Sequence, residues 1–242
     1  MNVEQLSKRL GTVASFIPKG ASVADIGSDH AYLPCHLAKQ GHITSAIAGE
    51  VVKGPYESAK RQVDATGLQD RIEVRLGSGL DVLKPGEVDC IAIAGMGGAL
   101  ISDILEAGKE KLPGVKRLIL QPNVGANSVR AWLYRNGWEL IDEAILEEDG
   151  KIYEVLAADK GDPEAPYKAD MERGLLFGPF LLKRKESVFI KKWSLEKENW
   201  QRVLSQLDKA QPSAEVDTKK EELFRKIRMV EEVLANEKNK RA

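Results

Sequence analysis

The segment SVADIGSDHAYLP, residues 22–34, decides the fold class of this chain. A short β-type run ends there in a turn that holds one glycine, Gly27, between Asp25 and Asp29. In doubly wound α/β domains, the first strand-to-helix turn binds a nucleotide-like cofactor. Dinucleotide enzymes place three glycines in this turn, so that a pyrophosphate can contact bare backbone at a helix N-terminus. One glycine with an acidic rim therefore argues against a pyrophosphate ligand.

The acidic rim suits a ligand that carries an ammonium and a sulfonium group. S-adenosylmethionine carries both, so the turn favours a methyltransferase over a dehydrogenase. The D-x-G-x-D pattern is short and carries little specificity alone. Its weight therefore depends on the organisation of the rest of the chain.

Strand-like and helix-like segments alternate from Ser22 onward, after a short amphipathic helix. Such alternation implies βαβ crossovers and a parallel sheet. After Gly137, two β-rich runs flank Asp149 and Gly150, which together mark a hairpin. The pattern predicts an α/β fold, a doubly wound, mostly parallel seven-stranded sheet of the class I Rossmann-like methyltransferase type. Strands are predicted at about 22–27, 44–50, 71–76, 88–94 and 116–121, and helices at about 31–40, 53–67, 98–108 and 126–136.

A proline-punctuated stretch, residues 161–166, predicts a domain boundary. We expect a Rossmann-like cofactor-binding domain in residues 1–160 and a helical domain in residues 161–242. The second domain is predicted to form an antiparallel coiled-coil hairpin that turns near residues 211–213, with its aromatic residues in the core. The residues that mark the two helices are Phe189, Trp193, Trp200, Val203 and Leu207, and then Leu223, Ile227, Val230 and Leu234.

The charge of the chain is unevenly distributed, although the formal net charge of its 242 residues is only −1. Residues 162–242 carry 18 Lys and Arg against 15 Asp and Glu. A mildly basic segment can contact phosphates, but mixed charge on solvated helices is the commoner explanation of such a balance. No signal peptide and no apolar run of about 20 residues is present. We therefore expect a cytoplasmic protein with no membrane partner.

Neither the cysteines nor the histidines predict a metal site. Cys35 and Cys90 lack C-x-x-C spacing, so neither a disulfide framework nor a zinc site is expected. His30, His36 and His42 recur every six residues, a spacing that does not place them on one helix face. Of the three, only His30 lies near the predicted cofactor turn, where it could orient a substrate.

Ligands of doubly wound sheets bind beyond the carboxyl ends of the strands. Glu50 ends the second strand about twenty residues past the glycine turn, the spacing of a carboxylate that accepts ribose hydroxyls. Gly95, Gly97 and Gly98 permit close approach of a cofactor or base. The predicted cofactor-binding residues are Asp25, Gly27, Ser28, Asp29, Glu50, Gly77, Ser78, Gly79, Ala94, Gly95, Met96 and Gly97.

Gly98 and residues 121–123 follow the fourth and fifth strands and are predicted to bind substrate. The amides of Gln121 and Asn123 can read a nucleobase edge, and Asn123 can also cap the following helix. Pro122 lies between them.

Four motifs occur in order before the helical hairpin: GSDHAYLP at 27–34, AGMGG at 94–98, LQPN at 120–123 and FGPFLL at 177–182. They resemble the bacterial tRNA (adenine(22)-N(1))-methyltransferase family over essentially the whole chain. AGMGG followed by LQPN is the most specific part, because most class I enzymes acting on adenine carry an N-P-P-Y-type motif after the fourth strand. The resemblance implies methyl transfer from S-adenosylmethionine to N(1) of adenosine 22 in tRNA.

The chemistry of this reaction and the positions of the residues suggest further roles. Asp29, His30 and Asn123 are the candidates for catalysis, with Asp29 stabilising the cationic product or accepting a proton from the exocyclic amine. The helical domain is expected to contact tRNA phosphates, and no obligate protein partner is evident. The residues predicted to contact tRNA there are Lys183, Arg184, Lys185, Lys191 and Lys192.

Two other interpretations stay open from the sequence. One is an S-adenosylmethionine-dependent methyltransferase of another substrate, whose hairpin serves only self-association. The other is a noncatalytic RNA-binding protein with a degenerate Rossmann-like domain. The intact acidic rim argues against the second.

Overall fold

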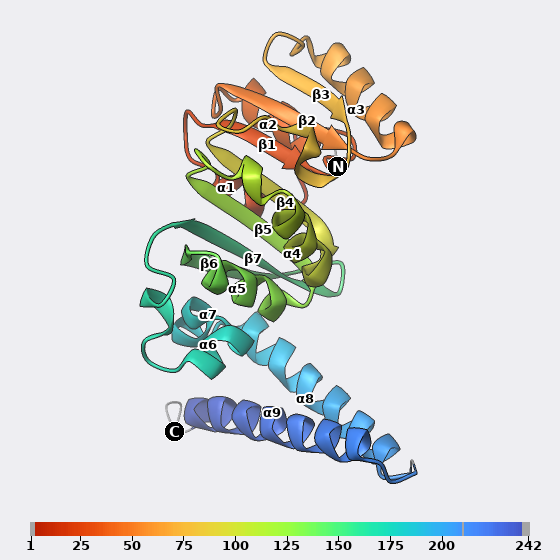
Figure 1. The fold of residues 1–242 in the computed structure, drawn as a ribbon, viewed down its shortest axis with the longest axis vertical. Helices are drawn as coiled ribbons and strands as arrows, with labels where there is room; N and C mark the ends of the chain where they lie inside the picture. The colour runs from red at the N-terminus through yellow and green to blue at the C-terminus, as the bar shows by residue number, and fades with distance from the viewer. Residues whose placement is uncertain (1–2, 210, 239–242) are drawn as a thin grey trace. The chain divides into compact units, whose positions relative to one another are not determined.

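The structure, a computed structural model, describes residues 3–209 and 211–238 (Figure 1). Each strand and helix predicted between residues 22 and 136 is present. The main difference is that the fourth and fifth strands are longer at their carboxyl ends than predicted. The elements of this part are α1 (Lys8–Phe16), β1 (Ser22–Ile26), α2 (Tyr32–Lys39), β2 (Ser45–Glu50), α3 (Lys53–Thr66), β3 (Ile72–Leu76), the 3₁₀ turn η1 (Gly79–Val82), β4 (Cys90–Gly97), α4 (Gly98–Ala107), η2 (Lys109–Lys111), β5 (Arg117–Val124) and α5 (Ala126–Arg135).

The strands form one seven-stranded sheet in the order β3-β2-β1-β4-β5-β7-β6. Strands β1 to β5 pair in parallel, and β7 (Lys151–Lys160) pairs antiparallel with both β5 and β6 (Trp138–Glu148). The central strands β1 and β4 are rich in small apolar residues because both faces of a parallel sheet are covered. The predicted class I methyltransferase topology is thereby confirmed.

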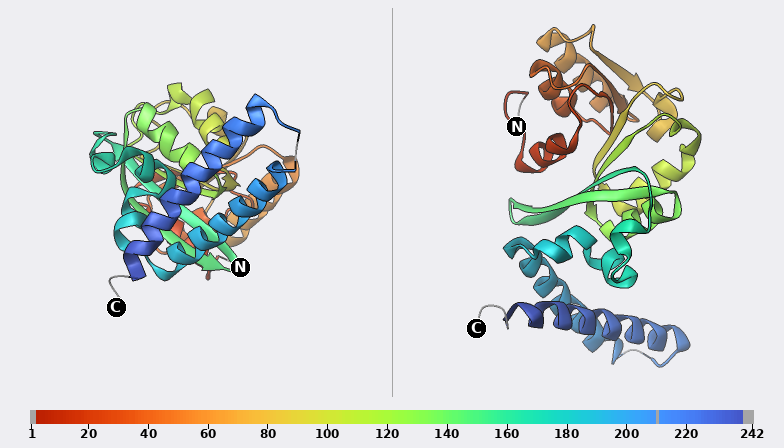
Figure 2. Two further views of the ribbon diagram at one scale, coloured as in Figure 1. Left: turned by 90° about the horizontal axis from the view of Figure 1, so that it is seen from below. Right: turned by 90° about the vertical axis from the view of Figure 1, so that its left-hand side faces the viewer.

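Helices cover both faces of the sheet (Figures 1 and 2). On one face, α1, α2 and α3 pack against alternate residues of the strands, such as Val23, Ala92 and Ile119. On the other face, α4 and α5 pack against Ile93 and Leu120. The two faces follow from the period-2 alternation of side chains along each strand. The strand order reverses between β1 and β4, and this switch point fixes where a ligand can bind.

The β6–β7 hairpin closes through a two-residue turn, as its sequence predicts. Asp149 (φ +50°) and Gly150 (φ +72°) lie in the left-handed region, between the paired residues Glu148 and Lys151. The Glu148 carboxylate accepts hydrogen bonds from the backbone N–H groups of Lys8 (2.5 Å) and Arg9 (3.1 Å). A carboxylate at a helix N-terminus is stabilising, so the hairpin holds the start of α1.

A buried ion cluster joins the FGPFLL motif to the sheet. Arg130 on α5 donates to Glu143 on β6 and to Glu154 on β7, each at 2.6 Å, and all three side chains are buried. The other oxygen of Glu143 accepts from the backbone N–H of Phe180 at 3.1 Å. Gly178 has φ +89°, and a Cβ there would lie 2.6 Å from both Arg130 and Glu143. Only glycine fits this position, because it lacks a side chain and tolerates positive φ.

Residues 161–182 therefore belong to the first compact unit. The chain divides into a unit of residues 1–182 and a unit of residues 183–242, whereas the sequence placed the boundary between residues 160 and 161. Tyr167, Phe177 and Leu181 are buried in this intervening stretch. The stretch contains the 3₁₀ turn η3 (Ala165–Tyr167), α6 (Met171–Phe177) and the start of α7 (Pro179–Arg184).

The second unit contains the predicted helical hairpin, α8 (Ser187–Leu207) and α9 (Ala214–Lys238). Ion pairs from Lys197 to Glu231 (3.7 Å) and from Lys220 to Asp208 (2.8 Å) show that the helices run antiparallel. Their buried residues include the predicted Phe189, Trp193, Leu223, Ile227 and Val230, and also Leu204 and Val233, which the heptad pattern missed.

Candidate active site at the carboxyl edge of the sheet

The turn after β1 is narrow and needs its glycine. Gly27 has φ +73°, and its N–H and that of Ser28 both donate to the carbonyl of Gly49 on β2, at 2.9 and 3.2 Å. A Cβ at Gly27 would lie 2.3 Å from Cε of Met96, which lies near the carboxyl end of β4. Asp29 also adopts positive φ (+55°). The turn is therefore held between β2 and the end of β4.

Two buried carboxylates stand at the ends of the neighbouring strands β1 and β2. Asp25 accepts a 2.5 Å hydrogen bond from Oγ of Ser28. Burial raises the pKa of Asp25 to about 6, although this hydrogen bond lowers it. Glu50 accepts a hydrogen bond from the backbone N–H of Asp29, and burial raises its pKa as well. Buried acids with raised pKa values at such an edge are typical of a functional site.

The AGMGG and LQPN motifs form one structural unit. Gly95 (φ +82°) bulges out of β4 between Ala94 and Met96, which keep their partners on β5. Its N–H donates to Oε1 of Gln121 at 3.0 Å, and its carbonyl accepts from Nδ2 of Asn123 at 2.8 Å. Both backbone groups that the bulge removes from the ladder are therefore satisfied by side-chain amides.

This geometry changes the interpretation of three predicted substrate-binding residues. The side chain of Gln121 is buried and its oxygen is already bonded, and Pro122 is buried beside it. Gly98 is also buried, and a Cβ there would lie 2.0 Å from the carbonyl oxygen of Gly125. We assign these three residues to holding the rim together. Asn123 is exposed and is the member of this group that can meet a substrate.

Arg9, on α1, reaches the same rim. Its Nη1 donates to Oε1 of Gln121 at 2.6 Å, and its guanidinium lies 5.6 Å from the ring centroid of Tyr153. The positive charge of Arg9 also acts on Asp25, where it opposes the rise in pKa. Arg9 was not among the residues predicted from the sequence. The available signal was a charged residue spaced three positions from Leu6 and therefore on the apolar face of an amphipathic helix.

The other predicted residues of the turn and the β3 loop lie around Glu50. The N–H of Gly77 donates to the carbonyl of Glu50 at 2.8 Å, followed by Ser78, which is exposed, and Gly79, which has positive φ (+51°). His30 lies at the exposed side of the turn, with Nε2 3.6 Å from Oδ1 of Asp29. The loop after β3 therefore contacts the backbone of Glu50, and the turn after β1 contacts its carboxylate.

The remaining histidines contact backbone away from the rim. His36 and His42 bond the carbonyls of Val3 and Ile17, each at 2.8 Å. Within residues 3–209 and 211–238, no three His, Cys, Asp or Glu side chains are grouped as metal ligands would be.

The basic residues predicted to contact RNA lie at the start of the second unit, between the end of α7 and the first turns of α8. Lys183, Arg184 and Lys191 are exposed. Nζ of Lys185 donates to the carbonyl of Val233 at 3.3 Å, and Nζ of Lys192 lies 4.9 Å from the ring centroid of Trp193. Two of the five therefore also support the helical hairpin.

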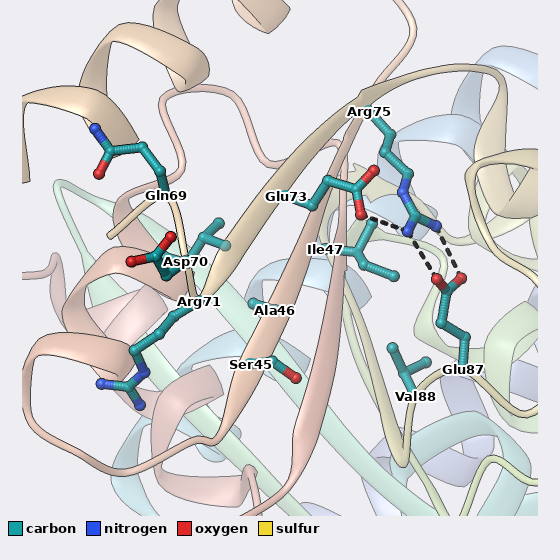
Figure 3. A pocket seen from close by; sticks show the side chains of 11 residues that line it. Ser45, Ala46, Ile47, Gln69, Asp70, Arg71, Glu73, Arg75, Glu87 and Val88 are labelled. Atoms are coloured by element: carbon teal, nitrogen blue, oxygen red, sulfur yellow. Dashed lines mark hydrogen bonds and ion pairs between the residues drawn. The ribbon is translucent and has the colours of Figure 1, made fainter. Parts of the chain in front are cut away.

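A hollow of about 460 Å³ lies at the amino ends of β2 and β3, away from the acidic rim (Figure 3). Three of its charged groups bind one another, since Arg75 donates to both Glu87 and Glu73. The hydrogen bonds from Arg75 lower the pKa of Glu87 to about 2, although burial acts to raise it. The residues that line the hollow are Ser45, Ala46, Ile47, Gln69, Asp70, Arg71, Ile72, Glu73, Arg75, Glu87 and Val88.

The arrangement suits binding and orientation more than covalent chemistry. Cys35 and Cys90 are buried, and burial raises the pKa of the Cys90 thiol to about 12, so neither thiol is a ready nucleophile. The rim offers Asp25 and Glu50 for an ammonium and for ribose hydroxyls, with an open backbone bulge next to them. In the described part of the chain, no helix combines the length and apolar character required to span a bilayer.

Known proteins share this sequence and fold. The family model described as tRNA (adenine(22)-N(1))-methyltransferase matches residues 23–232. The Bacillus subtilis tRNA (adenine(22)-N(1))-methyltransferase is 53% identical over 235 residues, covering 97% of this chain and 99% of that protein. Its crystal structure matches with a TM-score of 0.92 at 52% identity, over 96% of this chain and 99% of that one. A Streptococcus pneumoniae protein solved in complex with S-adenosyl-L-methionine matches with a TM-score of 0.84 at 44% identity, over 95% and 100%. The chain therefore belongs to the tRNA (adenine(22)-N(1))-methyltransferase family.

Proposed function

We propose that this protein transfers the methyl group of S-adenosylmethionine to N(1) of adenosine 22 in tRNA. The observation that carries the proposal is the pair of buried carboxylates, Asp25 and Glu50, beside the clamped bulge at Gly95. Family membership supplies the identity of the reaction. An enzyme acting on tRNA would work in the cytoplasm.

The donor fits the rim by charge. Asp25 would bind the ammonium of the methionine moiety, and Glu50 would accept the two ribose hydroxyls, because its carboxylate stands at the end of β2. When bound, S-adenosylmethionine supplies a methyl group activated by a sulfonium. The chain's own contribution is alignment, and near-attack positioning can be worth roughly 7–11 kcal/mol.

The acceptor would lie beside Asn123 and the Gly95 bulge. Gly97 has open space where a Cβ would stand, so the backbone here presents no side chain to a base. Val124 follows Asn123 and is 72% exposed, an unusual state for a valine that offers an apolar surface to a base. Oδ1 of Asn123 would accept from the exocyclic amine of adenine, and Asp29 would stabilise the cationic product.

Adenine N(1) lies on the Watson–Crick edge, so the base must leave its place in the folded tRNA, at a cost of a few kcal/mol. Favourable contacts to tRNA phosphates would offset part of this free-energy cost. Lys183, Arg184 and Lys191 are exposed and would supply such contacts from the end of α7 and the first turns of α8.

The test is methylation of transcribed tRNA by the purified chain, with the modified nucleotide mapped by mass spectrometry. We expect one N(1)-methyladenosine at position 22 and none in a tRNA that carries guanosine there. Methylation of a small molecule or protein but not of tRNA would refute the substrate assignment. Loss of all cofactor binding would refute the enzyme assignment.

A second experiment tests the basic residues. Replacing Lys183, Arg184 and Lys191 together by Gln should weaken tRNA binding and flatten its dependence on salt, because fewer counterions are released. Affinity for S-adenosylmethionine should not change. A matched control replaces Lys60, Lys84 and Lys109 of the first unit. An unchanged salt slope in the first variant would contradict the proposed phosphate contacts.

A further inference from the structure

Strands β4 and β5 end in a two-stranded lip, residues 94–97 and 121–124, beyond the ladders that they form with their other neighbours. Strand β1 pairs with β4 only as far as Ile93, and β7 pairs with β5 only as far as Leu120. The β4–β5 ladder continues from there to the pair of Gly97 and Val124. The lip therefore extends past these ladders at the edge where the cofactor and the base are proposed to bind.

The backbone at the tip of the lip is held on both sides. The amide nitrogen of Asn123 donates to the carbonyl of Gly95 at 2.8 Å. A Cβ on Gly98 would lie 3.1 Å from the carbonyl oxygen of Val124, so the start of α4 packs closely on this backbone. Valine is branched at Cβ and has few rotamers. The side chain of Val124 is therefore restricted in its direction before any RNA arrives.

Val124 is the most exposed large apolar side chain in the described part of the chain, at 72%. Successive side chains of a strand point to opposite faces, so Val124 and Asn123 lie on opposite faces of the lip. Asn123 is the member that can meet the adenine, and Val124 follows it directly and faces water. An apolar group in this state gains free energy when another surface covers it.

The surroundings of Val124 carry no formal charge. Charged residues make up 30% of the chain, but none occurs in residues 90–102 or 118–129, which contain the lip and the first turns of α4 and α5. Phosphates are bound by cations and polar groups, whereas every base offers a flat face on which a side chain can pack. The lip is therefore suited to nucleobases, and any cation that contacts a phosphate comes from outside it.

Extrusion of a base creates the need for an apolar group of this kind. The base that leaves uncovers the faces of its former neighbours in the stack, and this unstacking is part of the cost of extrusion. Proteins that open a stack of bases insert apolar side chains into it. A restricted valine next to the residue that receives the extruded base meets this requirement.

We propose that Val124 enters the stack of tRNA bases at the place that adenosine 22 leaves, and so holds the adenine extruded beside Asn123. Val124 is then a positioning residue, because it acts on the bases next to adenosine 22 and not on the reacting atoms. The inference rests on the proposed function, since it names the residue that keeps the same substrate base in the site.

The first test compares Val124→Ala with the wild-type chain on two tRNAs. One is the transcribed tRNA, and the other carries an abasic site opposite adenosine 22, so that its adenine is already loosened. Val124→Ala should lower kcat/KM for the intact tRNA by about 5- to 15-fold, the effect of removing two buried methyl groups. This deficit should nearly disappear with the abasic tRNA, because less unstacking remains to be done.

Met171→Ala is the matched control. Met171 is also an exposed apolar residue, but it starts α6 and lies outside the rim. This variant should keep the wild-type kcat/KM with both tRNAs.

The second test observes the base itself, with 2-aminopurine in place of adenine 22, because 2-aminopurine fluoresces more strongly when it leaves a stack. The wild-type chain and Met171→Ala, at saturating protein with S-adenosylhomocysteine, should increase its fluorescence. Val124→Ala should give a smaller increase at saturation. A residue that only supported the fold would weaken binding without changing the fluorescence of the bound tRNA.

The outcomes separate the inference from the function. Equal deficits of Val124→Ala with both tRNAs, or no deficit with either, overturn the inference and leave the proposed function standing. A full fluorescence increase with saturating Val124→Ala overturns it as well. If Val124→Ala does not fold, Val124→Thr, which keeps the branched shape, must show the same dependence on the substrate. A wild-type chain that methylates neither tRNA refutes the proposed function itself.

Discussion

Replacing the buried carboxylate of Asp25 by an amide should make the protein more stable and its cofactor binding weaker. The Asp25→Asn substitution keeps the shape of the side chain, and the new amide oxygen can still accept the hydrogen bond from Ser28. It removes the negative charge that burial disfavours and on which the proposed contact with the cofactor's ammonium depends. Stability and binding should therefore change in opposite directions, which an unspecific structural defect would not produce.

The magnitude follows from the pKa of Asp25, which burial raises from 3.8 to about 6. Between these values the folded chain keeps a proton that the unfolded chain has lost, so the free energy of unfolding falls as the pH rises from about 4 to about 6. At 1.36 kcal/mol per pKa unit, ionised Asp25 costs the folded state about 3 kcal/mol at neutral pH. Asp25→Asn should recover up to this amount at pH 7 and little at pH 4.

The assay is urea unfolding of both chains at several pH values from 4 to 8. Other acids, such as Glu50, Glu87 and Asp89, titrate in both chains, so they largely cancel in the difference between them. Calorimetry with S-adenosylhomocysteine should show affinity of the wild-type chain falling below about pH 6 and an affinity of the variant that is 10- to 150-fold lower at pH 8, from the loss of a charged partner. A stability difference that is flat from pH 4 to pH 8 would refute the reasoning.

Three further predictions concern the rim and the FGPFLL motif. Glu50→Ala should weaken cofactor binding by about 1.5–3 kcal/mol for each lost bond to the ribose, measured by calorimetry, and unchanged affinity would reject the ribose assignment. Gly97→Val should leave thermal stability nearly unchanged, since the site is open and its φ of −71° suits any residue, while slowing methyl transfer; normal transfer rates would count against the substrate surface. Gly98→Val, its matched control, should destabilise by roughly 1–3 kcal/mol or more because its Cβ meets the Gly125 backbone. Gly178→Ala should lower the free energy of unfolding by about 3–5 kcal/mol by disturbing the buried Arg130–Glu143 pair, and wild-type urea stability would show that the cluster can shift.

The sequence alone was sufficient for the order of the elements, the topology and the strand edge at which we propose that the cofactor binds. These features depend on short-range patterns: the alternation of apolar runs with helical periodicity, the Asp149-Gly150 turn and the single glycine after the first strand. Local steric rules decide each of them, so a few neighbouring residues suffice. Because parallel strands share one carboxyl edge, Asp25 and Glu50 could be placed together before any coordinates.

Tertiary structure decided what each residue at that edge does. Gln121 and Asn123 looked alike as readers of a base, but the Gln121 oxygen and the Asn123 amide nitrogen both bind the backbone of the bulge at Gly95, and of the two only Asn123 is exposed. Arg9 is 112 residues from the Gln121 oxygen that it contacts, and no spacing in the sequence encodes that pair. Contacts of this kind arise only when the sheet closes and brings distant strands side by side.

The end of the first unit also depends on tertiary contacts. The prolines at 163 and 166 signal a break in secondary structure, and the sequence placed the boundary there. The structure continues the unit to residue 182, because Gly178 fits against Arg130 and Glu143, which come from α5 and β6. Buried charged groups are stable only when each of them is paired and hydrogen-bonded. The FGPFLL segment supplies one such bond, from the backbone N–H of Phe180 to Glu143. Local patterns determined where the chain turns, and burial of distant charges determined which segments fold together.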